Sequence, residues 1–435
     1  MSIRESEVAG GGASAHSALL PEATENGKAR RAALEHARDS ERRPTSLVSY
    51  ASAGRVAVIG HAANALAAAE RLADALDCTA IITAGEARGP DDTGGAPAAR
   101  GKLRTIGARV SEVRGHLGAF CIDADVKGEK TPLAPSLITA HKPFDLVLDL
   151  SEPPFIRAEV PPAGYFAPRR DAAALEQALE QVSELVGEFE KPKYFSYDAA
   201  ICAHGNSGLT GCTRCLEACP TDAIRSLKDL IEVDPYLCQG GGSCATACPT
   251  GAITYAYPKV TDLLSNLRAV LHAYREAGGE AAGVLFHDGE AGRAWLETNA
   301  GRLPENLIPF EVEEIGSVGL DAWLALIAYG ARPVALFCPE GLPGSVRSEL
   351  EHQLEIARGI LAGMGYSQGL MVIAEDGAAD AAAAFSADGT AAIEPASFAA
   401  VDEKRTTVRM AVDHLYAQAP EPKAHVALPR GAPFG

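Results

Sequence analysis

The chain contains two neighbouring cysteine runs, Cys202-AHGNSGLTG-Cys212-TR-Cys215-LEA-Cys219-Pro220 and Cys238-QGGGS-Cys244-ATA-Cys248-Pro249. The second run overlays the first when it is moved back by 29 positions, because Cys244 then falls on Cys215 and Cys248 falls on Cys219. In this overlay Cys212 falls on a glycine and Cys238 falls on a leucine. The two runs are therefore halves of an internal repeat that differ at two cysteine positions.

The spacing of these cysteines indicates iron–sulfur clusters. Bacterial ferredoxins bind two clusters through C-x2-C-x2-C-x3-C-P runs, and the fourth cysteine of each run binds the other cluster. Two residues between successive ligands form a tight loop around one cuboidal cluster. The proline after the last ligand fixes its own φ and donates no hydrogen bond, which helps to turn the chain away. A doubled run of this kind predicts two clusters that exchange one ligand between the halves.

This exchange rule divides the seven cysteines into two sets. Cys212 and Cys215 would bind the first cluster together with Cys248 from the second run. The fourth ligand position of that cluster holds Leu209, and the nearest upstream candidate is Cys202. The second cluster would take the three remaining cysteines, Cys219, Cys238 and Cys244.

The second set lacks its central ligand, because Gly241 occupies that position. A run with thiolates only at its first and third positions is typical of three-iron clusters. We therefore expect one [4Fe-4S] cluster and one [3Fe-4S] cluster. The alternative is two [4Fe-4S] clusters, with water or hydroxide on the iron that faces Gly241. The glycine-rich loop Gln239–Ser243 would supply backbone N–H donors to the cluster.

Zinc sites and disulfides are the alternatives for clustered cysteines. Tetrahedral zinc also uses CxxC pairs, but it does not require the Cys-x3-Cys-Pro that ends both runs. Disulfides are rare in the cytoplasm, where we expect this chain.

His204 is interpreted as a hydrogen-bonding or surface residue rather than a ligand. The other three cysteines lie in or beside apolar stretches and are predicted to be buried free thiols: Cys78, Cys121 and Cys338.

At these residues the sequence resembles the bacterial dicluster ferredoxins of the 7Fe and 8Fe types. It resembles more closely the multidomain 4Fe-4S ferredoxin-type proteins of proteobacteria that are often encoded beside formate dehydrogenase components. The resembling phrases are GEFEKPKY at 187–194, GCTRC at 211–215 and CPTGAITY at 248–255. The resemblance implies electron transfer to or from a redox protein partner, with a formate dehydrogenase as one candidate. Longer members of that family carry a second ferredoxin module after a linker similar to residues 428–435.

The rest of the chain is predicted to form two α/β domains around this module, which makes the fold class α/β combined with α+β. Residues 1–53 are polar and are interpreted as a disordered arm, with one helix expected near residues 28–38. Residues 54–190 begin with a β–α–β pattern and predict a Rossmann-like α/β domain. Residues 191–258 form the dicluster ferredoxin module, and residues 259–400 form a small C-terminal α/β domain with a parallel sheet. Residues 401–435 are interpreted as a tail or linker.

The loop after the first predicted strand is a degenerate form of the dinucleotide-binding loop G-x-G-x-x-G. It begins at Gly60, but Ala62 and Ala65 replace the second and third glycines. Glu86 lies near the end of the next strand, where a ribose-binding acid would be. We interpret this domain chiefly as a Rossmann-like scaffold, with flavin or nicotinamide binding as the alternative. No catalytic residue is predicted.

Charge and hydropathy narrow the class of protein further. Acidic residues outnumber basic ones by 57 to 39, which gives a net charge of −18 and argues against nucleic-acid binding. The most apolar stretch, 320–337, is interrupted by Arg332 and Pro333, whereas a membrane span needs about 20 apolar residues. The N-terminus has no apolar run like that of a signal peptide, so we expect a cytoplasmic protein.

The sequence predicts an iron–sulfur electron carrier or relay subunit of a larger redox complex. The alternative is an iron–sulfur oxidoreductase that holds a flavin or nicotinamide in its N-terminal domain.

Overall fold

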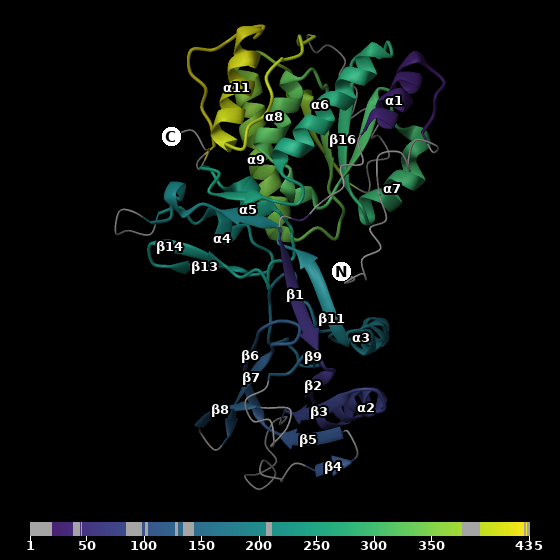
Figure 1. Ribbon diagram of the computed structural model, residues 1–435, viewed down its shortest axis with the longest axis vertical. Coiled ribbons are helices and arrows are strands. Elements are labelled where there is room, and N and C mark those ends of the chain that lie inside the picture. Colours follow the sequence, from purple (N-terminus) through teal and green to yellow (C-terminus); the bar gives the residue numbers. More distant parts are fainter. Residues whose placement is uncertain are drawn as a thin grey trace. The chain divides into compact units, whose positions relative to one another are not determined.

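The computed structural model describes residues 20–37, 44, 46–83, 98–100, 103–126, 129–133, 143–205, 211–375, 392–429 and 432. Within this part of the chain there are two compact units, whose elements are labelled in Figure 1. The first unit comprises Leu47–Lys191 and Asp234–Gln239. The second comprises the described residues within 20–46, Pro192–Val233 and 240–432.

The first unit is built on a mostly parallel sheet with the strand order β10-β9-β2-β3-β5-β4. Only the edge strand β4 runs antiparallel to its neighbour. Numbered along the chain, the parallel strands have the order 3-2-1-4-5, which is the order found in Rossmann folds. The predicted mixed α/β fold with a parallel sheet is therefore confirmed. The strands are β2 (Arg55–Gly60), β3 (Asp77–Ile82), β4 (Ala98–Arg100), β5 (Leu103–Gly107), β9 (Leu146–Asp149) and β10 (Tyr165–Phe166), and the helices are α2 (Ala62–Leu72) and α3 (Ala172–Glu184).

An antiparallel sheet in the same unit explains why Cys121 is not buried. This sheet consists of β6 (Arg109–Arg114), β7 (Cys121–Val126) and β8 (Glu129–Leu133). Successive side chains along a strand point to opposite faces, so Phe120 and Ile122 enter the core and Cys121 is exposed. The prediction of a buried thiol was wrong at this position, whereas Cys78 and Cys338 are buried as predicted. All ten cysteines lie in the described part of the chain, and none forms a disulfide.

The cysteine-rich module lies in the second unit and shows its internal repeat as two equivalent short helices. Helix α4 (Arg214–Glu217) contains Cys215, and helix α5 (Ser243–Ala247) contains Cys244. Two antiparallel strand pairs flank these helices, namely β12 (Phe195–Tyr197) with β15 (Ile253–Tyr255) and β13 (Ile224–Leu227) with β14 (Leu230–Val233). A short 3₁₀ turn, η2 (Ala199–Ile201), precedes Cys202.

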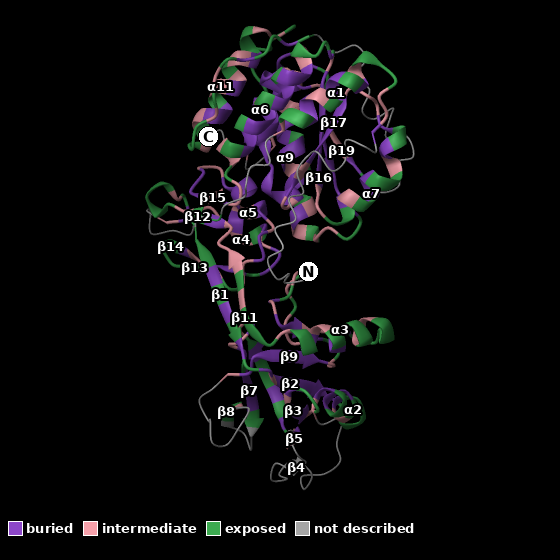
Figure 2. Ribbon diagram, turned by 45° about the vertical axis from the view of Figure 1, so that its right-hand side comes forward, coloured by how far each residue is buried: buried purple, intermediate pink, exposed green. Residues whose placement is uncertain are grey.

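The remainder of the second unit surrounds a four-stranded parallel sheet of order β17-β16-β18-β19. These strands confirm the predicted C-terminal parallel sheet. Helix α8 is buried along its whole length because α6, α9 and α11 all pack against it. Figure 2 shows the buried colour concentrated in this sheet and in the helices against it. The bounds are β16 (Gly283–Asp288), β17 (Leu307–Val312), β18 (Val334–Phe337), β19 (Met371–Ala374), α6 (Val260–Glu276), α7 (Ala291–Asn299), α8 (Leu320–Ala328), α9 (Gly344–Gly363) and α11 (Lys404–Ala417).

Two elements lie within the segment that the sequence predicts to be a disordered arm. Helix α1 (Glu25–His36) packs against α6, and strand β1 (Leu47–Ser52) pairs with β11 (Gly187–Pro192). Helix α1 confirms the helix expected near residues 28–38, and it buries a charged residue, Arg30, instead of a wholly apolar face. The Arg30 guanidinium is satisfied by the carbonyl oxygens of Pro304 and Leu307 at 3.0 and 3.1 Å. Residues 1–19, 38–43 and 45 of the predicted arm lie outside the described residues.

One further prediction differs from the structure in the C-terminal part. Helix α11 lies inside the predicted tail, and its residues Val408 and Leu415 are buried against α8. Thr261, near the start of α6, donates its hydroxyl hydrogen to Asp402, two residues before α11. The other predicted domain limits remain predictions, because the module and the C-terminal sheet belong to one compact unit.

Candidate functional site

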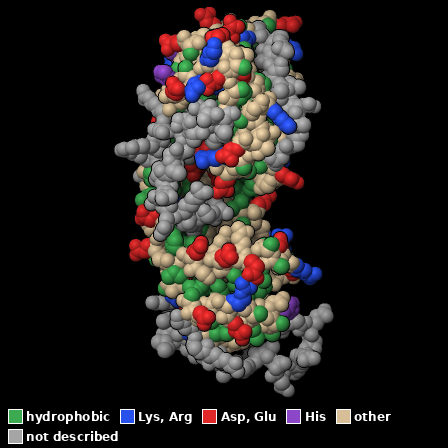
Figure 3. All heavy atoms as spheres, turned by 90° about the vertical axis from the view of Figure 1, so that its right-hand side faces the viewer, with side chains coloured by type: hydrophobic (Ala, Val, Ile, Leu, Met, Phe, Trp, Pro, Cys, Tyr) green, Lys and Arg blue, Asp and Glu red, His purple; other side chains and the backbone are tan. Residues whose placement is uncertain are grey.

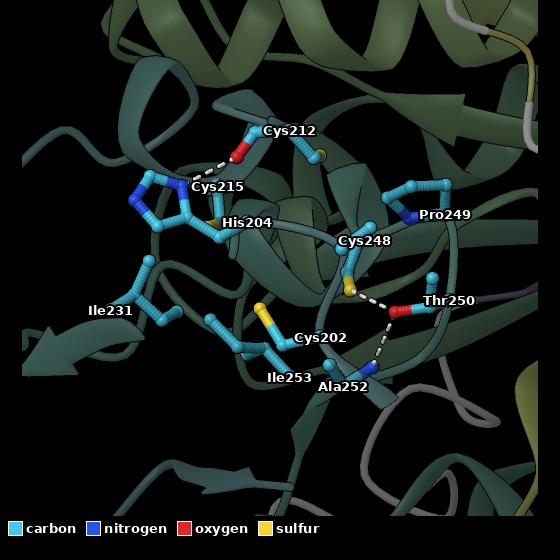
Figure 4. A pocket seen from close by; sticks show the side chains of 11 residues that line it. Cys202, His204, Cys212, Cys215, Ile231, Cys248, Pro249, Thr250, Ala252 and Ile253 are labelled. Atoms are coloured by element: carbon cyan, nitrogen blue, oxygen red, sulfur yellow. Dashed lines mark hydrogen bonds between the residues drawn. The ribbon is translucent and has the colours of Figure 1, made fainter. Parts of the chain in front are cut away.

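Four cysteines from both runs line one pocket in the second unit: Cys202, Cys212, Cys215 and Cys248. Cys202 follows η2, Cys212 precedes α4, Cys215 lies on α4, and Cys248 ends α5. Figure 4 shows the sulfur atoms of Cys202 and Cys248 directed into the same space. Three of these residues are those that the exchange rule assigns to the first cluster, and Cys202 is the nearest upstream candidate for the fourth ligand. Their role as ligands remains a prediction.

The three cysteines of the second predicted set are divided between the two units. Cys219 and Cys244 belong to the second unit, and Cys238 belongs to the short segment Asp234–Gln239 of the first unit. A second cluster bound by these three residues therefore also remains a prediction.

Within the first unit, the backbone around Cys238 is held by three side chains. The Tyr50 hydroxyl donates to the Tyr236 carbonyl oxygen at 2.7 Å, and the His116 ring stacks on the Tyr236 ring with centroids 4.3 Å apart. Lys191 donates from Nζ to the carbonyl oxygens of Tyr236 and Cys238 at 3.0 and 2.6 Å. Burial lowers the pKa of Lys191 to about 8. These contacts fix the chain that enters the second cysteine run.

The two Cys-Pro-Thr sequences make the same side-chain contact. The Thr221 hydroxyl lies 3.4 Å from the Cys219 sulfur, and the Thr250 hydroxyl lies 3.6 Å from the Cys248 sulfur. Each threonine follows its cysteine by two residues. Its hydroxyl lies beside the cysteine sulfur because the chain turns at the intervening proline. A hydroxyl in this position donates a hydrogen bond to a thiolate, and donors to cluster sulfurs raise the reduction potential.

Burial controls the acid–base chemistry of the thiols in the pocket. Burial, followed by the neighbouring thiols, raises the pKa of Cys215 to about 12, and burial also raises the pKa of Cys212. For Cys248 burial acts in the same direction, but hydrogen bonds from the backbone and from Thr250, together with the charge of Lys404, outweigh it and lower the pKa. Thiols as buried as Cys215 stay protonated unless a metal ion binds, and bound metals deprotonate them outright. The donor set therefore fits an iron–sulfur cluster.

His204 supports the pocket through hydrogen bonds from both of its ring nitrogens. Its Nδ1 donates to the Cys212 carbonyl oxygen at 2.8 Å, so in the neutral ring Nε2 accepts from the Ser226 hydroxyl at 2.7 Å. Both nitrogens are occupied, and the predicted hydrogen-bonding role is confirmed. Tyr197 is a residue that the sequence did not single out. Its hydroxyl is buried, and no hydrogen-bond partner lies within reach of it among the described residues. Burial, followed by the nearby Cys202 thiol, raises the pKa of Tyr197 to about 12.

The glycine-rich loop before α5 requires glycine at two of its three consecutive glycine positions. Gly240 and Gly242 have φ angles of +86° and +74°, which favour glycine, and a Cβ on Gly242 would lie 2.5 Å from Ser317. Gly241 has no positive φ, and a Cβ there would meet Pro220 at an ordinary 3.5 Å. The backbone therefore accommodates a side chain at Gly241, the position where the second run lacks its central cysteine.

The C-terminal α/β domain contacts the module at points that the sequence did not reveal. Arg214, between two of the pocket cysteines, donates to the carboxylate of Glu349 on α9 at 2.6 Å, and Gln353 donates to the same carboxylate at 2.7 Å. Thr246 on α5 donates to the carbonyl oxygen of Gly316 at 2.7 Å. No sequence signal connects these partners, because they are far apart along the chain.

Residues 210–252 match the family model of the 4Fe-4S dicluster domain. The matched segment includes six of the seven cysteines of the two runs, and Cys202 lies outside it. The chain therefore contains a 4Fe-4S ferredoxin-type domain, which supports at least one 4Fe-4S cluster. No curated protein is matched by the chain.

Among the described residues, no group of three or more His, Cys, Asp or Glu side chains is arranged to hold one metal ion. Cubane ligands bind different irons and need not converge on one point as zinc ligands do.

The degenerate loop at the end of β2 has a packing explanation. A Cβ on Gly60 would lie 3.0 Å from the Cβ of Leu150, just beyond β9, so the close approach of these two strands accounts for the glycine. Glu86 and Leu209, which the sequence analysis singled out, lie outside the described residues.

On the face drawn in Figure 3, acidic and basic side chains lie interspersed among uncharged ones. No helix in the described part of the chain is long and apolar enough to cross a membrane.

Proposed function

We propose that the protein transfers single electrons through two iron–sulfur clusters as a relay subunit or partner of a larger redox complex. The observation that carries this proposal is the shared pocket of four cysteines drawn from both halves of the repeat. The match to the 4Fe-4S dicluster domain supports it independently.

The chain's own residues set how the clusters would behave. Cys202, Cys212, Cys215 and Cys248 would hold the first cluster, and Cys219, Cys238 and Cys244 would hold the second, in the three-iron form or as a [4Fe-4S] cluster with a water-derived ligand. A bound cluster supplies one-electron chemistry at a potential that depends on hydrogen bonds to sulfur and on solvent exposure. The hydrogen bonds to sulfur would come from Thr250 and Thr221. The buried lining of the pocket would limit the solvent exposure of the first cluster.

The partner is proposed to be a redox protein in the cytoplasm, with a formate dehydrogenase as one candidate. This part of the proposal rests on the sequence resemblance around residues 187–255. The excess of acidic residues suits docking to a basic surface around the partner's redox centre.

The test is a redox titration of the purified protein monitored by EPR, with iron and sulfide determined on the same sample. The proposal expects about seven or eight irons per chain and two signals that appear and disappear reversibly with potential. If the clusters cannot be reduced reversibly, they only stabilise the fold and do not transfer electrons. Zinc bound in place of iron would contradict the whole proposal.

A second candidate function is an oxidoreductase that binds a flavin or nicotinamide on the first unit. The observation that favours it is the 3-2-1-4-5 strand order, since nucleotides bind Rossmann folds where the strand order reverses, here between β2 and β9. Flavin released by boiling, or cluster reduction by NAD(P)H alone, would support this candidate. A colourless boiled supernatant and no reduction by NAD(P)H would leave the relay function.

A further inference from the structure

Lys404, the first residue of α11, reaches α5, the short helix that contains Cys244 and ends at Cys248. Its Nζ donates hydrogen bonds to the carbonyl oxygens of Ala245, Thr246 and Cys248 at 2.9, 2.7 and 3.1 Å. A lysine ammonium has three N–H donors, so every donor is matched by one carbonyl group. The side chain thus satisfies backbone carbonyls at the carboxyl end of α5 that have no partner inside the helix.

The position of Lys404 is unfavourable for its own helix and favourable for α5. A cation in the first turn of a helix opposes the helix dipole, whereas a cation at a carboxyl end is stabilising. The chain after Cys248 also packs on the lysine stem, since a Cβ on Gly251, whose φ is +76°, would lie 3.0 Å from the Lys404 Cβ. Both observations indicate that Lys404 is placed for the cysteine module and not for α11.

The neighbouring cation does not share this arrangement. Arg405 donates one hydrogen bond, from Nε to the Pro249 carbonyl oxygen at 3.2 Å, and it is exposed. An exposed charge is screened by water and salt, and a partly buried one is screened much less. Lys404 is only partly exposed, so its charge acts more strongly on the pocket that Cys248 lines.

We propose that Lys404 is a positioning residue that holds α5 against the first cluster and raises the reduction potential of that cluster through its positive charge. This inference rests on the proposed electron-transfer function. Reduction adds one electron and no proton, so the charge of the cluster core falls from +2 to +1. A fixed positive charge close to the Cys248 ligand stabilises the more negative reduced state.

The experiment compares Lys404→Met, Lys404→Gln and Lys404→Arg with the wild-type protein in an EPR-monitored titration with dithionite. At the potential where half of the wild-type first cluster is reduced, both neutral variants should lower the ratio of reduced to oxidised cluster about tenfold. For one electron this factor equals 59 mV. Lys404→Arg keeps the charge and should stay within a factor of two of wild type.

The matched control is Lys423→Met, which removes the same charge from an exposed position. Lys423 contacts the backbone near the end of α9, roughly 20 Å along that helix from Glu349, and should leave the potential unchanged. A wild-type potential in both neutral variants would overturn the inference, even if their thermal stability falls. If neither neutral variant holds clusters, Lys404 is a structural residue and the inference also fails. Wild-type clusters that do not titrate would instead overturn the proposed function.

Discussion

At the scale of single residues, Thr221 and Thr250 mark the two halves of the repeat. Each hydroxyl lies beside the sulfur of the cysteine two positions earlier, at 3.4 and 3.6 Å. The Cys248 sulfur belongs to the shared pocket, and Cys219 is assigned by sequence to the other cluster. Substitution of one threonine should therefore change the reduction potential of one cluster and leave that of the other unchanged.

Thr250→Val should lower the potential of the first cluster and leave the second unchanged. A hydrogen bond to a charged acceptor contributes about 1.5–3 kcal/mol, which corresponds to roughly 65–130 mV for one electron. Thr221→Val should show the reverse pattern. Redox titration followed by EPR separates the two signals. If both variants moved the same signal, Cys219 and Cys248 would bind one cluster, and the exchange of ligands between halves would be wrong.

Gly241→Cys should convert the second cluster from a three-iron into a four-iron form. A Cβ at this position meets only Pro220 at an ordinary distance, so the backbone accepts the new side chain. The oxidised three-iron cluster is paramagnetic, and an oxidised low-potential [4Fe-4S] cluster is EPR-silent. The variant should therefore lose the EPR signal of the oxidised protein and gain about one iron per chain.

Two results would contradict this reading of Gly241. A wild-type protein without an oxidised EPR signal would favour two [4Fe-4S] clusters from the start. An unchanged signal and iron content in Gly241→Cys would show that the position does not face an iron. Gly242→Cys is the matched comparison, and it should fail to fold correctly because its φ of +74° and its contact with Ser317 require glycine.

At the scale of elements, local patterns were readable from the sequence and distant contacts were not. The spacing around Cys215 and Cys248 predicted a set of four cysteines that the structure brings to one pocket, because ligand spacing within a short loop is a local property. The strands of the C-terminal sheet were predictable as continuous apolar runs. Helix α11 was missed although Val408, Ala411 and Leu415 recur at helical spacing, because the whole segment was interpreted as a tail or linker. The role of Lys404 was hidden because its partners on α5 lie more than 150 positions away.

The 3₁₀ turn η4 (Ile315–Ser317) follows a carboxylate whose protonation should affect stability. Burial, together with the nearby acids Glu313, Asp288 and Glu290, raises the pKa of Glu314 from 4.5 to about 7. Between these two pH values the folded state keeps a proton that the unfolded state has released. The stability of the wild-type protein should therefore fall as pH rises through this window.

Glu314→Gln removes this dependence and should be more stable than wild type above pH 7, by on the order of 1–3 kcal/mol. Thermal unfolding measured at intervals from about pH 5 to pH 8 gives the comparison. The difference should be near zero at the acidic end and level off above pH 7. Glu297→Gln, an exposed carboxylate on α7, is the control and should reproduce the wild-type profile. A constant difference at all pH values would contradict the assignment to Glu314.

At the scale of the whole molecule, the cysteine module shares one compact unit with the C-terminal parallel sheet. Thr246, Lys404 and Arg214 join the module to η4, α11 and α9. A module held in this way cannot change the geometry of its cysteines without disturbing the sheet domain. The C-terminal domain, in which the sequence predicts no catalytic residue, thus supports the cysteine module physically.

The pair Arg214–Glu349 tests this support directly. The Glu349 side chain is only 6% exposed, so Arg214→Met leaves a buried carboxylate without its cation and should destabilise the unit by roughly 3 kcal/mol. Clusters should then be lost faster on heating, as measured by the decay of their visible absorbance. The double variant Arg214→Met/Glu349→Met buries no charge and should recover much of the loss. The exposed pair Arg71–Glu176 is the control, and Arg71→Met should change the rate little. If Arg214→Met kept clusters as well as wild type, the module would be stable without its anchor on α9.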